Sequence, residues 1–99
     1  MLLRERETPE GLLVSVCDEA CLGETYENGD ITLEVEAEFY GGDEAVDAGP
    51  DAVVDALQRA SVANIVGADS VAVAVDAGLV DEKTVLEVET TKHAQLMWL

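Results

Sequence analysis

Residues 50–78 read PDAVVDALQRASVANIVGADSVAVAVDAG, and the spacing of their apolar side chains predicts two consecutive helices. Pro50 opens the first helix, where the missing N–H of proline costs nothing, and the apolar spacing continues over residues 50–65. A glycine interrupts the pattern, and an aspartate then caps a second helix over residues 69–77. Gly78 follows, at a position where helices often end in the left-handed conformation. We therefore expect two adjacent helices in this part of the chain.

Strands are expected on the N-terminal side of these helices. Residues 12–17 form a short apolar run after a turn that contains proline and glycine, and they are predicted to pair with residues 2–6 as a hairpin. Residues 31–39 alternate between apolar side chains and threonine or glutamate. This period of two is typical of a strand with one face in the core and one acidic face in water.

Short turns are expected to join these strands. Residues 18–23 predict one helical turn, with Asp18 as its cap and Gly23 as its end. Residues 26–30 are rich in residue types that tolerate unusual backbone angles, and they predict a further turn. After the third strand, a tight glycine turn and then an acidic loop as far as Gly49 are expected.

Two closing strands complete the predicted fold. Residues 85–88 and 94–99 have strand character and are joined by a short polar connection. The predicted order is three strands, two helices and two strands, which is typical of an α+β domain. We expect a single domain over residues 1–99, in which a mostly antiparallel sheet carries two helices on one face.

The charge of the chain is its most unusual property. Asp and Glu number 22 against five Lys and Arg in 99 residues, which gives a formal net charge of −17. A body of this size repels itself strongly in ordinary buffer, and molar salt screens most of that repulsion. No run of five consecutive acids occurs. The acidity therefore predicts a halophile's surface and carries no information about the partner.

Composition also limits where the protein is expected to act. The N-terminal residues contain no apolar signal segment, and no run approaches the roughly 18 apolar residues that span a bilayer. A cytoplasmic protein without membrane contact is expected. In that compartment the two cysteines, Cys17 and Cys21, are expected to be free thiols.

Cys17, Cys21 and His93 are the only thiol and imidazole groups in the chain. A structural zinc site normally takes four such ligands, so these three are weak metal candidates, and no cofactor is expected. Cys17 and His93 form the enzymatic alternative, a nucleophile with its base, which requires the two side chains to lie within hydrogen-bond reach. Ordinary packing of both residues is the interpretation that we favour.

Uncharged polar and glycine residues at the expected ends of helices and strands form the candidate binding site. Sites tend to lie at such ends, because a rigid scaffold positions them there. The paired glycines do not match a phosphate-binding loop, which needs wider spacing and a following helix. The candidate residues are Phe39, Tyr40, Gly41, Gly42, Asn64, His93 and Gln95.

Several short segments together resemble a known family. These are Val16–Glu19, Leu22–Gly23, Phe39–Gly42, Ala63–Gly67, Gly78–Val80 and His93–Gln95. In this order they are similar to the archaeal family called domain of unknown function 424, and the acidity would make the chain a haloarchaeal member. The surface is more acidic than the resemblance implies, and Cys21 departs from it. The resemblance implies an α+β domain and supplies no activity, cofactor or catalytic residue.

Three functions remain open from the sequence. The first is a non-enzymatic binding module, associated with RNA or with a protein of the translation apparatus. The second is a small thiol enzyme that uses Cys17 and His93. The third is a structural protein, monomeric or homodimeric, with Trp98 at an interface, because the C-terminal residues are apolar enough for a contact.

Overall fold

Within residues 1–97, six strands form the main sheet of the protein. In spatial order they are β5 (Val46–Asp47), β1 (Leu2–Thr8), β2 (Gly11–Cys17), β6 (Val62–Val66), β8 (Thr91–Met97) and β7 (Leu86–Val88). The only parallel pairing in this sheet joins β2 to β6, and the other neighbours are antiparallel. The computed structural model describes residues 1–97, so the expected interface residue Trp98 lies outside the described residues.

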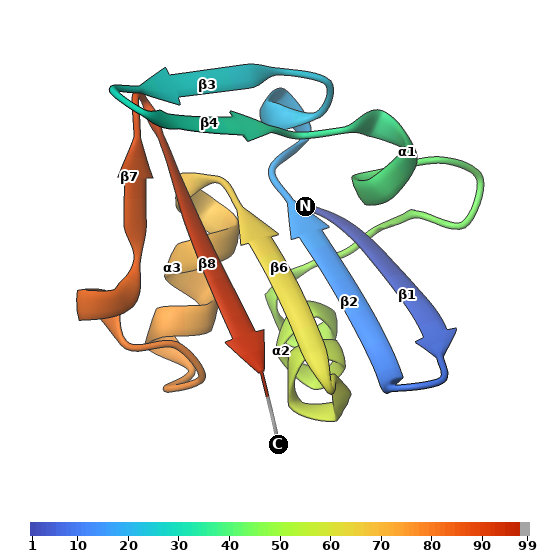
Figure 1. Cartoon of the computed structure of the whole chain (residues 1–99). Helices are drawn as coiled ribbons and strands as arrows, with labels where there is room; N and C mark the ends of the chain where they lie inside the picture. The colour runs from blue at the N-terminus through green and yellow to red at the C-terminus, as the bar shows by residue number, and fades with distance from the viewer. Residues whose placement is uncertain (98–99) are drawn as a thin grey trace.

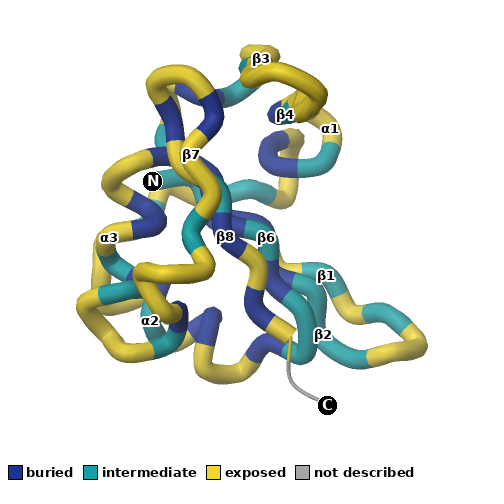
Figure 2. Tube along the Cα trace, turned by 60° about the vertical axis from the view of Figure 1, so that its left-hand side comes forward, coloured by how far each residue is buried: buried dark blue, intermediate teal, exposed yellow. Residues whose placement is uncertain are grey.

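Two helices, α2 (Pro50–Arg59) and α3 (Ala68–Asp76), cover one face of the sheet (Figure 1). They pack on alternate side chains of the central strands, and Val53, Leu57 and Ile65 are fully buried there. Figure 2 shows the buried residues following the central strands, with exposed residues along the loops and the outer surfaces. The largest apolar cluster of the protein therefore lies between the sheet and these two helices.

A smaller layer covers one end of the opposite face. It consists of the 3-10 turn η1 (Glu19–Cys21), the hairpin of β3 (Thr25–Asn28) and β4 (Ile31–Glu34), and the short helix α1 (Ala37–Tyr40). We call these residues, 19–40, the cap. Its buried side chains meet Cys17 and Val66 of the sheet in a second apolar cluster.

The structure confirms the predicted α+β fold, a mostly antiparallel sheet with two helices on one face. The first hairpin forms as expected from β1 and β2. Pro50 begins α2, and Gly78 follows α3 with a φ of +74°. The last strand is described as far as Met97, so the end of the predicted strand 94–99 lies outside the described residues.

The predicted order of strands and helices was wrong between the two helices. The helix expected over residues 50–65 ends at Arg59, and the strand β6 follows it. Ser61 donates its backbone N–H to the carbonyl of Leu12 at 2.8 Å, which directs the chain into the sheet. The segment that follows contains β-branched residues such as Val62 and Ile65, which favour strands. Its apolar pattern is therefore compatible with a strand as well as with a helix.

The structure also corrects three predictions in and after the cap. The strand expected over residues 31–39 stops at Glu34, and residues 37–40 are helical. The turn expected over residues 26–30 is mostly strand β3, which pairs with β4. The loop expected up to Gly49 contains the short strand β5 at the edge of the main sheet.

Asp18 is an N-terminal capping residue of a helix, but of a different helix from the one predicted. Its side chain makes no capping bond to the 3-10 turn that follows it. Its carboxylate instead accepts hydrogen bonds from the backbone N–H groups of Asp69 (3.1 Å) and Ser70 (2.9 Å) and from the Ser70 hydroxyl (2.7 Å). Gly67 precedes α3 with a φ of +112°, and a Cβ there would collide with the Asp18 side chain. Asp18 therefore caps α3.

Candidate binding surface

The strand register arranges the face opposite the helices in three rows. Residues paired on neighbouring strands share a face, so each row crosses β1, β2, β6 and β8. The row under the cap is Leu2, Cys17, Val66 and His93. The next row, which we call the polar row, is Arg4, Ser15, Asn64 and Gln95. The last row is Arg6, Leu13, Val62 and Met97.

The polar row and the last row together form what we call the open face. Figure 1 looks onto this face, with α2 and α3 behind the sheet and the cap at its upper edge. None of these eight residues is Asp or Glu, although the chain contains 22 acidic residues. The open face also carries two of the five basic residues, Arg4 and Arg6. The acids of the chain are therefore dispersed over the other surfaces.

Hydrogen bonds fix the side chains at both ends of the polar row. The Gln95 side-chain amide donates a hydrogen bond to Asn64 Oδ1 at 2.9 Å. At the other end, Arg4 Nη1 donates to the carbonyls of Glu38 and Gly41, the latter at 3.2 Å. Arg4 thus fixes helix α1 to β1, while the amide pair stays at the surface.

A hollow of about 300 Å³ opens between the cap and the polar row. We call it the His93 hollow. It is lined by Glu34, Glu36, Phe39, Tyr40, Asn64 and His93, which come from β4, α1, β6 and β8 and the residues between them. It therefore brings residues from distant parts of the chain to one place.

The ionisable groups of the hollow differ in charge. Burial lowers the pKa of His93 from its usual 6.5, so the ring is neutral at pH 7. Burial, with a smaller effect of the nearby Cys17, raises the pKa of Tyr40 to about 12, so its hydroxyl keeps its proton. The exposed carboxylates of Glu34 and Glu36 are then the charged groups of the hollow.

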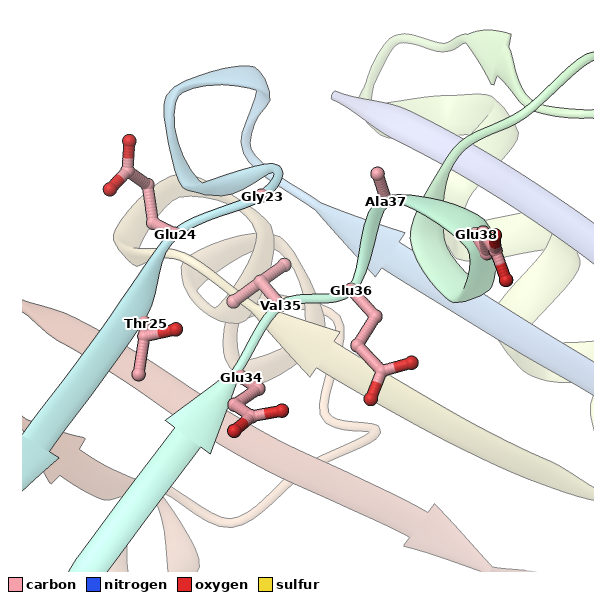
Figure 3. Close-up of a pocket in the computed structure, with 8 residues that line it drawn as sticks. All are labelled: Gly23, Glu24, Thr25, Glu34, Val35, Glu36, Ala37 and Glu38. Atoms are coloured by element: carbon pink, nitrogen blue, oxygen red, sulfur yellow. The ribbon is translucent and has the colours of Figure 1, made fainter.

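The same two glutamates separate this hollow from a second one of about 320 Å³. Figure 3 shows the second hollow, where the side chains of Glu24, Glu34, Glu36 and Glu38 lie around the buried Val35. Among residues 1–97, none of these four carboxylates lies within 4.0 Å of a basic group. This edge of the cap is therefore negative, in contrast to the open face.

Phe39 stands at the boundary between the two regions. Its ring meets Tyr40 edge to face, with the ring centroids 5.0 Å apart. The Arg6 guanidinium carbon lies 5.3 Å from the centroid of the same Phe39 ring, which is a favourable cation–π distance. Phe39 thus links the cap to the last row of the open face.

The candidate residues predicted from the sequence are brought together in part. Phe39, Tyr40, Asn64 and His93 line the His93 hollow, and Gln95 is joined to it through its hydrogen bond to Asn64. The two glycines do not line this hollow. Gly41 is buried beside Leu22, and Gly42 turns the chain with a φ of +87°.

The geometry argues against the catalytic pair of Cys17 and His93. Val66 stands between them in the same row, and two strand spacings separate them by about 10 Å. Cys17 is fully buried, and this burial, together with the nearby Cys21, raises the pKa of its thiol to about 11. The thiol is therefore protonated and inaccessible, the reverse of an activated nucleophile.

The thiols also do not form a metal centre in the described part of the chain. Within residues 1–97, no three His, Cys, Asp or Glu side chains converge in a way that could hold a metal ion. Both cysteines are free and buried, and the Cys21 sulfur lies 3.5 Å from the Thr91 hydroxyl. These contacts agree with ordinary packing under the cap.

Sequence reasoning missed the two arginines, Ser15 and the pair of glutamates at the hollow. One signal was present in the segment Arg4–Glu7, where Arg and Glu alternate and a strand therefore places both arginines on one face. Glu34 and Glu36 were expected on the wet face of one strand, and only the break after Glu34 brings them to the hollow.

Comparisons with known proteins agree with this fold. No helix within residues 1–97 has the length and apolar character needed to cross a membrane. No curated protein matches the chain. A solved structure, an uncharacterized conserved protein from Methanopyrus kandleri, is 27% identical with a TM-score of 0.72, over 99% of this chain and 93% of that one. The model of the family described as "Protein of unknown function (DUF424)" matches residues 5–99, and the chain belongs to this family.

Proposed function

We propose that the protein is a non-enzymatic binding module and that the open face is its contact surface. The absence of acidic residues from that face, in a chain with 22 of them, carries the proposal. Covering a carboxylate without a partner for its charge is expensive. The open face is a part of the surface that a partner can cover without that cost, because its polar groups are the Asn64 and Gln95 amides, the Ser15 hydroxyl and two arginines that already make contacts within the protein.

The partner is RNA or a protein of the translation apparatus. The Asn64 and Gln95 amides can donate and accept hydrogen bonds, so they suit base edges as well as peptide groups. Phe39 offers a half-buried aromatic ring beside them. The acid-free face supports binding to either class of partner, and the test must therefore detect both.

The chain contains two glutamines on opposite sides of the sheet, and these supply a matched test. Gln95 lies on the open face, and Gln58 is exposed on α2. A Gln95→Trp variant places a large ring where the partner would sit, and Gln58→Trp places the same ring on the helical side. Affinity purification with each bait in molar KCl, the medium that the acidity predicts, should recover the partner with the wild type and with Gln58→Trp.

Gln95→Trp should lose that partner. Recovered material is analysed as protein and as RNA, with and without ribonuclease treatment, to identify the class. Far-ultraviolet circular dichroism of each bait checks that the fold is retained. Equal recovery with both tryptophan variants, or recovery of nothing above background with the wild type, would contradict the proposal.

A further inference from the structure

We infer that the partner presents a basic, extended protein segment, which places an arginine or lysine side chain in the His93 hollow and lies along the open face. The inference rests on the proposed function, because it names the partner of the same surface. It follows from the charge of the hollow, the state of its carboxylates and the chemistry of its walls.

The charge of the hollow favours a cation. The acidic residues that line the hollow are Glu34 and Glu36, and the two other ionisable residues that line it, His93 and Tyr40, are uncharged at pH 7. A phosphate at this position would meet two carboxylates and no basic side chain among the lining residues. A guanidinium or ammonium group would meet two opposite charges.

The carboxylates are available to such a group. Arg4 and Arg6 line a neighbouring hollow together with Glu36, but Arg4 is bonded to backbone carbonyls and pairs with Glu44, and Arg6 contacts the Phe39 ring. Neither Glu34 nor Glu36 forms an ion pair within the described residues. A ligand cation therefore has no internal competitor within ion-pair distance.

The walls of the hollow suit the remainder of a long basic side chain. Phe39 and Tyr40 provide aromatic surface in the hollow. Methylene groups of arginine and lysine pack well on such surfaces while the charged end stays near acceptors. The hollow can thus hold the apolar stem and the charged end of one side chain.

The open face explains why the partner should be an extended segment. The polar row and the last row continue from the hollow and contain no acid, so a chain that lies along them can bring neutral or apolar residues to Leu13, Val62 and Met97. Met97 is 60% exposed. The Asn64 NH2 group and the Gln95 carbonyl remain beside the hollow for the backbone of the segment.

The local chemistry of the surface decides between this partner and RNA. A polyanion would meet the carboxylates of Glu34 and Glu36 at the hollow. The open face carries only two arginines, and both make contacts within the protein. The observations therefore favour a basic protein segment.

The test follows the amide signals of the protein by NMR during two titrations at the same KCl concentration. One probe is the peptide acetyl-Val-Arg-Val-Arg-Val-amide, and the other is octauridine. The peptide should give saturable shifts that are confined to Asn64, Gln95, His93 and their neighbours. Its dissociation constant should rise about fivefold in Glu34→Gln/Glu36→Gln, since two exposed ion pairs are lost.

A matched variant separates specific binding from general attraction to an acidic protein. Glu7→Gln/Glu10→Gln removes the same two charges at the exposed far end of the first hairpin, and it should change the dissociation constant less than about twofold. Equal weakening in both double variants, shifts spread over the surface, no saturable shift, or confined shifts with octauridine would each overturn the inference. If Gln95→Trp still loses its cellular partner, the proposed function stands and only the basic segment is rejected.

Discussion

The two faces of the main sheet differ in what covers them, although the same strands supply both. In β2, Val14 and Val16 are fully buried under the helices, whereas Leu13 of the opposite face remains partly exposed. One face is sealed by α2 and α3. On the other face the cap covers one end, and beyond it Ser15 is buried while Leu13 and Val62 are partly exposed and Met97 is exposed. The difference indicates that stability comes mainly from the helical face, which leaves the open face available for the proposed contact.

The distribution of Asp and Glu also distinguishes the open face from the rest of the surface. On the surfaces that only face water, Asp and Glu are dispersed, as on the outer sides of α2 and α3. On the open face they are absent. The open face therefore differs from the surrounding surface in its charge as well as in what covers it.

The largest effect is expected when an apolar side chain is truncated on the helical side of the sheet, and the matched truncation on the open face should have little effect. Leu57→Ala empties a fully buried position of α2 and should lower the free energy of unfolding by about 2–5 kcal/mol. Met97→Ala removes an exposed side chain of the open face and should change it by less than about 0.5 kcal/mol. Urea unfolding at one fixed KCl concentration measures both. Similar losses for the two variants would break the comparison of the faces.

A second prediction tests whether the cap buries the row of side chains beneath it. With a pKa of about 11, against 9.0 for an unperturbed thiol, Cys17 should carry about a hundredfold less thiolate at pH 8 and react correspondingly slowly with iodoacetamide. Its reactivity should keep rising with pH beyond 9. Mass spectrometry of the native and urea-unfolded protein gives the two rates. A native rate equal to the unfolded one would show that the cap does not bury this thiol.

A third prediction concerns Asp18, the N-terminal capping residue of α3. Asp18→Ala removes three hydrogen bonds at the start of the helix and should lower the free energy of unfolding by about 1–2 kcal/mol. Asp76→Ala, at the exposed C-terminal end of the same helix, is the matched control and should be neutral or slightly stabilising, because it removes a negative charge from the negative end of the helix dipole. Thermal unfolding followed by circular dichroism compares them. Equal losses would contradict the capping role.

The smallest effect is expected from His93, at the boundary between the cap and the open face. Burial lowers its pKa in the folded protein, so between the folded pKa and the unfolded value of 6.5 the unfolded chain binds a proton that the folded one does not. The wild type should therefore lose more free energy of unfolding than His93→Gln when the pH falls from 7 to 5. Unfolding curves at both pH values give this difference, and a smaller loss in the wild type would contradict it.

Local pattern predicted those parts of the fold that local chemistry decides. Proline at the start of α2, the glycine after α3 and the first hairpin all appear where the sequence indicates them. The end of the strand at Glu34 was not predictable in this way. There, Val35 bonds to the backbone of Gly23 and Glu24, and Arg4 holds helix α1. These contacts come from distant residues, which a pattern within nine residues does not contain.

The candidate site shows the same limit. Asn64 was placed in a helix, so its pairing with Gln95 across two strands could not be anticipated. The structure places Asn64 and His93, both selected from the sequence, at the same hollow, and their role in binding stays a prediction. Glu34 and Glu36 were missed, because a charged residue on the wet side of a predicted strand carries no signal of its own.

The hydrogen bonds of Asp18 also bear on the order in which the protein folds. The N-terminal cap of α3 comes from a residue 52 positions earlier in the chain than Ser70, so the helix lacks this support while the chain is open. Strands β2 and β6 must lie side by side before the carboxylate reaches the helix, and closing so long a loop is slow. We therefore expect α3 to become stable late, together with the central pair of strands.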